Sequence, residues 1–375
     1  MHLNHDPLWW RFFPRKDLTQ VYLSTAIRSF ALSLLSLFVP LYFYVELQYP
    51  LVQTLWFYIF FALALGLASP FAAAFAARYG MKHSIFVSVP LYLGFIFLLY
   101  RLPFSPVPLF VLSILSGVAI AFYWIGMHLI FVKASDHQHR GEEVGLQMVF
   151  SILASLLGPL LGGFLIVAFG FPVVFATASF FLLLSAVVLF SSKEKHVPYH
   201  FSWRSLLQRG DWRNALFFVS QGSRATAEGT IWPLFIFFIL GNYFSLGVVG
   251  SLLSGISALV IWFMGRYSDH TSKRKIVWLV TGFESISWFL RALVRTTLHV
   301  FGVTIFGALT LGFLAAPLGA LVYDKGQRHA AAYFVQREMF ISLGRILVLL
   351  LVLVTDSLAG GMIFNGFANL ATLLF

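Results

Sequence analysis

Cysteine is absent from this chain, which excludes disulfide bonds and metal sites built on thiolates. Charged residues are scarce as well, because Asp, Glu, Lys and Arg make up only 10% of the sequence, against about 25% in an ordinary soluble domain. The sequence contains neither the Gly-x4-Gly-Lys-Ser/Thr loop that holds ATP nor a His-Glu-x-x-His zinc motif. We therefore predict no catalytic residue, no metal site and no cofactor, and we do not expect an enzyme.

Apolar residues fill most of the sequence. They account for 59% of the chain, and phenylalanine alone occurs 43 times. A soluble protein of this size cannot bury so much apolar surface, so the bilayer must be its solvent. We expect an all-α integral membrane protein with twelve transmembrane helices, near residues 18–45, 51–76, 84–101, 105–133, 142–168, 171–191, 213–240, 244–264, 276–297, 299–322, 333–355 and 359–375.

Basic residues predict the orientation in the membrane. Lys and Arg gather in the N-terminal tail and in every second loop, whereas the opposite side holds Arg101 and Arg295, with Arg291 at its boundary. The positive-inside rule then puts both termini in the cytoplasm of a multi-pass protein of the cytoplasmic (inner) membrane. The same rule accounts for the net charge of +11 without a nucleic-acid partner.

The longest polar stretch divides the chain into two halves. We expect a six-helix bundle at residues 1–191, a cytoplasmic linker with an interfacial helix at 192–212, and a second six-helix bundle at 213–375. The halves repeat, because the segment from Ser24 to Arg28 matches the segment from Ser220 to Arg224 at an offset of 196. Such a pseudo-symmetric repeat predicts a cavity between the bundles, near the middle of the membrane.

A charged loop at 265–275, GRYSDHTSKRK, resembles the Gly-x-x-x-Asp-Arg-x-Gly-Arg-Lys signature of the major facilitator superfamily. A weaker copy, AARYGMKH, lies in the first half and lacks the acid. The resemblance covers essentially the whole chain and implies a conformational switch in which Asp269 contacts the start of the fifth helix. The alternative is a solvated loop charge. The switch residues are Gly265, Asp269, Lys273, Arg274, Arg78, Gly80, Lys82 and Arg140.

The fifth predicted helix carries a run of small residues that is similar to a pattern of exporters in this family, which exchange drug-like solutes for protons. Small residues let two helices approach closely in lipid, and a proline can bend a helix. A seam that opens and closes fits this composition, and static tight packing fits it equally. The fourth helix departs from those exporters, because residues 111–121 contain no basic group. The seam residues are Gly145, Ala154, Gly158, Pro159, Gly162 and Gly163.

Two arginines are expected near the middle of the membrane, Arg28 in the first helix and Arg224 in the seventh. Charges in the membrane are costly, so each calls for a role or a partner. Facing one cavity, the pair would clamp an anion such as a carboxylate or a phosphate. Alternatively, Glu228 neutralises Arg224, and backbone carbonyls or Gln221 hold Arg28. The predicted substrate cavity comprises Arg28, Ser24, Gln221, Arg224, Glu228, Tyr123 and Trp124.

Three residues are candidates for proton coupling. Glu228 is the first, because a dry cavity favours its protonated form and Arg224 favours its charged form. A histidine has an unperturbed pKa of about 6.5, which would allow His128 a proton role, although a packed histidine is the simpler explanation. Glu338 either lines the cavity or pairs within its own helix with Arg345. Glu284 shares a face of the ninth helix with Arg291 and is expected to form a structural ion pair with it.

These observations predict a secondary transporter that moves a small organic solute by alternating access, with proton-coupled efflux as the leading hypothesis. The alternative is an importer or exchanger of an organic anion or organophosphate that uses Arg28 and Arg224. A second alternative is a membrane sensor or scaffold that transports nothing. The expected partners are a small-molecule substrate, protons or another coupling ion, and membrane lipids. We expect a monomer.

Overall fold

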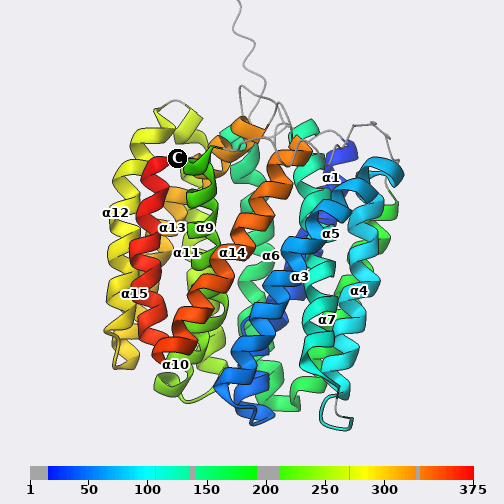
Figure 1. Cartoon of the computed structure of the whole chain (residues 1–375), viewed down its shortest axis with the longest axis vertical. Coiled ribbons are helices and arrows are strands. Elements are labelled where there is room, and N and C mark those ends of the chain that lie inside the picture. The colour runs from blue at the N-terminus through cyan, green and yellow to red at the C-terminus, as the bar shows by residue number, and fades with distance from the viewer. Residues whose placement is uncertain (1–15, 106, 135–139, 192–210, 270, 327–329) are drawn as a thin grey trace, which may run out of the picture.

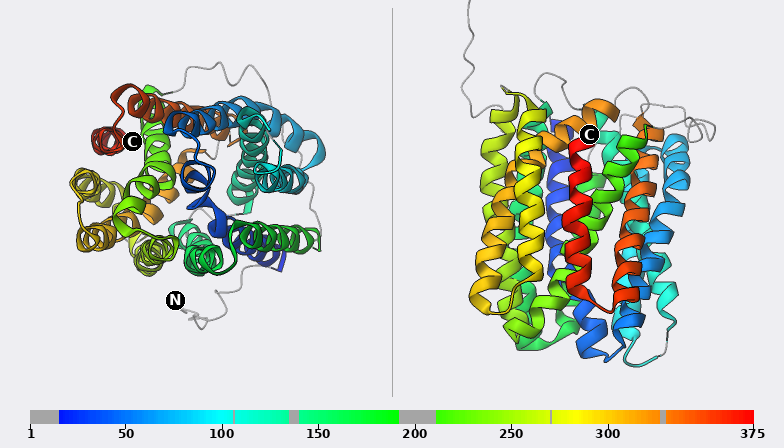
Figure 2. Two further views of the ribbon diagram at one scale, coloured as in Figure 1. Left: turned by 90° about the horizontal axis from the view of Figure 1, so that it is seen from below. Right: turned by 60° about the vertical axis from the view of Figure 1, so that its left-hand side comes forward.

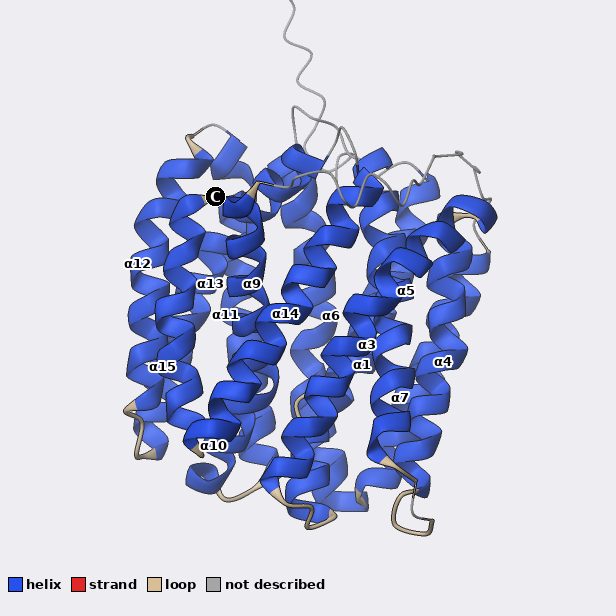
Figure 3. Ribbon diagram, viewed as in Figure 1, coloured by secondary structure: helices blue, strands red, loops and turns tan. Residues whose placement is uncertain are grey.

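The computed structural model describes residues 16–105, 107–134, 140–191, 211–269, 271–326 and 330–375. Within these ranges every regular element is a helix, and no strand occurs (Figure 3). The long helices run side by side along one axis (Figure 1). We call the end where the C-terminus lies in Figure 1 the upper end, and the other the lower end. The predicted interfacial helix and linker fall almost entirely outside the described residues.

The helices match the twelve predicted membrane segments within a few residues. In the first half they are α1 (Lys16–Ser36), α2 (Val39–Leu41), the π-helical turn η2 (Tyr42–Glu46), α3 (Leu51–Tyr79), α4 (Met81–Arg101), α5 (Leu109–Ala134), α6 (Arg140–Phe169) and α7 (Phe171–Phe190). In the second half they are α9 (Trp212–Thr226), the π-helical turn η3 (Ala227–Ile231), α10 (Trp232–Leu240), α11 (Tyr243–Asp269), α12 (Lys273–Ala292), α13 (Thr297–Gly326), α14 (Ala330–Thr355), α15 (Leu358–Asn369) and the short 3₁₀ turn η4 (Leu370–Leu374). The first, seventh and last segments are each built from more than one element. The prediction of an all-α membrane protein is confirmed.

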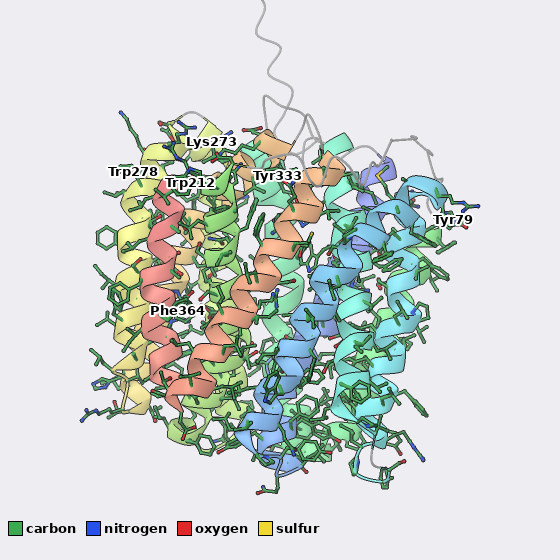
Figure 4. The ribbon with its side chains drawn as sticks, viewed as in Figure 1. Tyr79, Trp212, Lys273, Trp278, Tyr333 and Phe364 are labelled. Atoms are coloured by element: carbon green, nitrogen blue, oxygen red, sulfur yellow. The ribbon has the colours of Figure 1, made fainter. Side chains whose placement is uncertain are left out.

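The outer surface of the bundle is apolar, as a lipid-facing surface must be. Phe180 and Leu279 expose 61% and 71% of their surface on the outside of the bundle. Trp212 and Trp278 are also exposed, and they lie near the upper end together with Lys273 (Figure 4). Tryptophan and basic residues concentrate where the hydrocarbon meets water. The upper end of the bundle therefore has the composition of a membrane interface.

The helices form two bundles that meet along two pairs of long helices. Helix α6 of the first bundle packs against α11 of the second, and α3 packs against α14. Seen from below, α3 and α14 lie side by side at one edge of the molecule (Figure 2). These two pairs are the main contacts between the halves, so they determine how the interior between the bundles is enclosed.

Apolar clusters lie toward both ends of the bundle, and each contains residues from both halves. At the lower end, Phe38 and Phe171 belong to one cluster with Trp232, and Tyr243 packs against it. The ring of Tyr243 lies 6.3 Å from that of Phe38 and 5.5 Å from that of Phe171. At the upper end, Phe131, Leu129, Leu314 and Phe334 belong to a second cluster. Both halves therefore contribute to the apolar packing at each end of the bundle.

Candidate functional site

The described residues line two cavities between the bundles, one above the other. The lower cavity has a volume of about 390 Å³ and reaches from Arg28 to Glu228. The upper cavity has a volume of about 290 Å³ and is lined by His128, Arg224 and Arg337 among others. Three residues line both: Ser29, Tyr123 and Trp124. The predicted cavity between the halves is therefore present, and the aromatic pair of α5 stands at the junction of its two parts.

Arg28 is a buried cation on the wall of the lower cavity. It lies on α1, and only 2% of its surface is exposed. Its guanidinium carbon sits 4.0 Å from the centre of the Tyr123 ring and 5.9 Å from that of Tyr92. None of its three guanidinium nitrogens has a hydrogen-bond partner among the described residues. Aromatic faces attract a cation, but they do not replace the hydrogen bonds that the guanidinium gave up on leaving water.

Glu228 faces the same cavity from the other half, and it has a partner. It lies in the π-helical turn η3, and such turns are frequent at functional sites. Its Oε2 accepts a hydrogen bond from Arg291 of α12 at 2.8 Å. Its Oε1 is buried and has no hydrogen-bond partner in the described part of the chain. The carboxylate is therefore neutralised on one side and open on the other.

Arg291 is held in one position by aromatic rings and by a glycine. It is 1% exposed, and its guanidinium lies 4.1 Å from the ring of Trp288 and 5.1 Å from that of Trp232. Gly307 of α13 makes room for it, because a Cβ atom there would lie 2.5 Å from an Arg291 nitrogen. The side chain therefore has little freedom to turn away from Glu228.

Two predicted ion pairs are absent from the described residues. Glu284 does not pair with Arg291, since seven residues of helix separate their backbones by about 10 Å. The Glu284 carboxylate instead accepts hydrogen bonds from Trp288 Nε1 at 3.1 Å and from the Thr310 hydroxyl. Glu228 does not pair with Arg224 either, because the carboxylate turns to Arg291, which is more deeply buried and has the greater need of a counter-ion.

The expectation of two arginines facing one cavity is also corrected. Arg28 lines the lower cavity, and Arg224 lines the upper one. Arg224 donates a hydrogen bond to Gln221 Oε1 at 3.2 Å. Gln221 is therefore a partner of Arg224 and not of Arg28. Ser24 turns away from both cavities, because its hydroxyl donates to the Ser185 carbonyl on α7 at 2.7 Å. It joins two helices of the first half.

The upper cavity is bordered by a polar network that joins the halves. His128 Nδ1 lies 2.9 Å from the Tyr323 hydroxyl of α13, and its Nε2 lies 2.9 Å from an Arg337 nitrogen of α14. Glu338 Oε1 is 3.5 Å from the same Nε2 and also contacts Arg337. The structure thus brings together two of the predicted proton-coupling residues, His128 and Glu338. The third, Glu228, lies apart from them, on the lower cavity.

The glycines of α6 form close contacts on two sides. A Cβ atom at Gly158 or Gly162 would collide with Ser33 or with the Leu34 carbonyl of α1. On the other side, Gly163 meets the Tyr243 carbonyl of α11. Pro159 fits against Gly247 and Gly250 of α11, where a Cβ would lie within 3 Å of it. Helix α6 therefore fills the narrow space between α1 and the opposite half. The surroundings of Gly145 and Ala154 lie outside the described residues.

The predicted switch loops are described only in part. Gly80 ends α3 with φ of 109°, a backbone conformation that favours glycine. Lys273 pairs with Asp324 of α13 at 3.8 Å. Arg78 and Arg274 are exposed at the upper end, Lys82 is half-buried there, and Gly265 is buried within α11. The expected switch contact depends on the side chains of Asp269 and Arg140, which the structure does not describe.

Reasoning from the sequence left Tyr92 and Tyr323 out of this site and gave Arg291 the wrong partner. Tyr92 and Tyr323 occur in apolar runs with no distinguishing pattern. Arg291 was noticed, but the seven-residue spacing to Glu284 suggested the wrong partner. Matching the charged residues of the second half with one another could have found the partner of Arg291, because Glu228 and Arg291 carry opposite charges and each needed a partner in the membrane.

Two six-helix bundles with polar cavities at their interface define a class of multi-pass helical membrane protein. The chain belongs to the Major Facilitator Superfamily, whose family model matches residues 21–372.

Among characterised structures, the human organic anion transporter MFSD10 (TETRAN) has a similar fold. Its TM-score is 0.72 at 13% sequence identity, and the match covers 98% of this chain and 100% of that one. In sequence, the chain is 26% identical over 253 residues to the uncharacterized protein YqgE of Bacillus subtilis (strain 168), covering 62% of this chain and 58% of YqgE. It is also 26% identical over 225 residues to the multidrug resistance protein MdtG of Escherichia coli O9:H4 (strain HS), covering 55% of this chain and 54% of MdtG. The chain thus spans little more than half the length of these curated relatives.

Proposed function

We propose that the chain is a secondary transporter that carries a small organic anion through the membrane by alternating access. The observation that carries this proposal is Arg28, a buried cation without a hydrogen-bond partner on the wall of a cavity between the halves. An unpaired charge at this depth costs a few kcal/mol or more. A carboxylate or phosphate is the group that satisfies a guanidinium best, through paired charge-assisted hydrogen bonds.

The packing supports a transport cycle. Residues 1–191 and 213–375 would rock against one another along the pairs α6–α11 and α3–α14, with 192–212 as the linker. Apolar and aromatic contacts between the halves border the cavities above and below, so each end could open while the other stays closed. With the basic residues of the upper loops in the cytoplasm, the upper end would be the cytoplasmic gate. The protein would work as a monomer in the cytoplasmic membrane.

Proton-coupled efflux is a second candidate. The glycine pattern of α6 supports it, and so does the name of the relative MdtG, a multidrug resistance protein. The network of His128, Arg337 and Glu338 supplies groups that could exchange a proton between the halves. The structural neighbour MFSD10, an organic anion transporter by its title, favours the anion proposal at the level of fold alone. Export of an organic anion in exchange for protons would agree with both candidate functions.

The test is a thermal-shift titration of the purified protein with benzoate, benzyl alcohol and benzylamine, which differ in charge. We expect benzoate alone to stabilise the protein, by mass action on the folded state. The Arg28→Met variant should lose this stabilisation. Arg101→Met, which removes an exposed arginine at the end of α4, should retain it. Stabilisation by benzylamine instead would refute the anion proposal, and no effect of any probe would favour a sensor or scaffold.

A further inference from the structure

The lower cavity presents two unsatisfied polar groups, one from each half. The guanidinium of Arg28 lies on α1, and Glu228 Oε1 lies on η3. Much of the wall beside them is aliphatic or aromatic and includes Leu32, Trp232 and Leu246. A cavity of this size with a few convergent polar groups is the usual form of a small-molecule site. The two groups fix the polar ends of any ligand that lies between them.

The charges of the two groups are not equivalent. Glu228 already has a counter-ion, because Arg291 lies 2.8 Å from its other oxygen. Arg28 has no carboxylate within salt-bridge distance among the described residues. A ligand with one negative charge therefore neutralises the cavity. A second negative charge would meet the Glu228 carboxylate, and like charges repel one another.

The Glu228 end calls for a hydrogen-bond donor. An ionised carboxylate oxygen only accepts hydrogen bonds, so Oε1 is satisfied by an O–H or N–H group of the ligand. Arg291 lies against the rings of Trp288 and Trp232 and against Gly307, so it has little room to move away from Glu228. Glu228 is thus a fixed acceptor. The rings of Tyr123, Trp124 and Trp232 on the wall suit a flat aromatic body between the two ends.

We propose that the lower cavity selects an aromatic monoanion whose far end carries a neutral hydrogen-bond donor, and that Glu228 sets this selectivity by accepting the donor and excluding a second negative charge. This inference rests on the proposed anion transport and names its substrate class. Arg28 binds the anionic group of the ligand, and Glu228 accepts a hydrogen bond from the donor at its opposite end. Arg291 is a positioning residue that holds Glu228 in place.

The experiment compares ligands that differ only at the far end. Purified wild-type protein is titrated with 4-hydroxybenzoate, 4-methoxybenzoate and terephthalate. It is also titrated with the corresponding cinnamates, which are longer by one vinyl group. We expect the hydroxy ligand of the fitting length to bind about tenfold more tightly than its methoxy analogue, as a hydrogen bond to a charged acceptor provides. Terephthalate and its longer analogue should bind more weakly than either.

The Glu228→Gln variant should reverse this order. Without the carboxylate, Arg291 becomes a second unpaired cation on the wall, so the dicarboxylate should become the tightest ligand and the hydroxy group should lose most of its advantage. Glu284→Gln is the matched control, because it neutralises another buried carboxylate of the same half that does not line the lower cavity. Its order of ligands should be that of the wild type. A merely structural role of Glu228 would lower all affinities together.

The outcomes separate this inference from the proposed function. If no carboxylate binds the wild type, the anion proposal itself fails. If carboxylates bind through Arg28 but the wild type prefers methoxy ligands or dicarboxylates, only the role of Glu228 fails. An unchanged order in Glu228→Gln overturns it too. Should that variant not fold, Glu228→Asp keeps the charge and withdraws the oxygen, so it must weaken the hydroxy preference while still excluding the dicarboxylate.

Discussion

Two arginines, one in each half, are buried to the same degree and differ in one contact. Arg28 and Arg291 expose 2% and 1% of their surface, and each lies close to an aromatic ring, at 4.0 Å from Tyr123 and 4.1 Å from Trp288. Arg291 has the Glu228 carboxylate at 2.8 Å, and Arg28 has none. The aromatic setting is therefore common to both, and only the missing anion singles out Arg28. Arg291 is thus paired within the fold, whereas the charge of Arg28 is left for a ligand to pair with.

The largest expected effect comes from removing Arg291, the arginine that is paired with a carboxylate. Arg291→Met should destabilise the protein by about 3–5 kcal/mol, because it leaves the Glu228 carboxylate without its counter-ion. The measurement is unfolding of the purified protein by SDS in mixed micelles, monitored by tryptophan fluorescence. The double variant with Glu228→Gln should recover much of the loss, since it removes the stranded charge. A loss of less than 1 kcal/mol in the single variant would show that the pair has no role in stability.

The sequence was sufficient to predict the helices but not which charges pair. The twelve helices follow from the length of the apolar runs, because lipid requires continuous helices. The duplication relates Arg28 of α1 to Arg224 of α9, but it implied equivalent roles. Arg28 has its physical counterpart in Arg291, which sits in a different helix and outside the repeated segment. Which charges pair across helices depends on rotation and packing, and a single sequence does not encode these in any local pattern.

The same substitution at Arg28, the unpaired arginine, should have the opposite effect on stability. Arg28→Met removes a buried charge that has no internal partner and should raise stability by about 2–3 kcal/mol, the cost of an arginine at the centre of a membrane helix. The same SDS titration measures it, without added anions. In parallel, benzoate should no longer stabilise the variant. If Arg28→Met were as destabilising as Arg291→Met, then Arg28 would have a structural role and the contrast would not hold.

A smaller perturbation can displace Arg291 without removing it. Gly307→Ala places a methyl group 2.5 Å from an Arg291 nitrogen and 3.0 Å from the Ser287 hydroxyl. We expect a loss of about 1–3 kcal/mol from this overpacking, together with a weaker preference for hydroxylated monoanions. Gly302→Ala on the same helix is the control, since a Cβ there meets nothing within 4 Å. Equal losses in the two variants would mean that helix α13, and not the space around Arg291, is responsible.

The smallest effect concerns the upper contact between the halves, which involves neither arginine. Tyr323→Phe removes the hydroxyl that lies 2.9 Å from His128 Nδ1 and should cost about 1 kcal/mol. Tyr333→Phe is the matched control, because the Tyr333 hydroxyl is buried without a hydrogen-bond partner among the described residues and its removal should cost nothing. Both variants should bind benzoate as the wild type does, since the upper network and the lower cavity hold separate charges. If Tyr323→Phe changed benzoate affinity tenfold, the two cavities would be coupled, and the assignment of anion binding to Arg28 alone would have to include the His128 network.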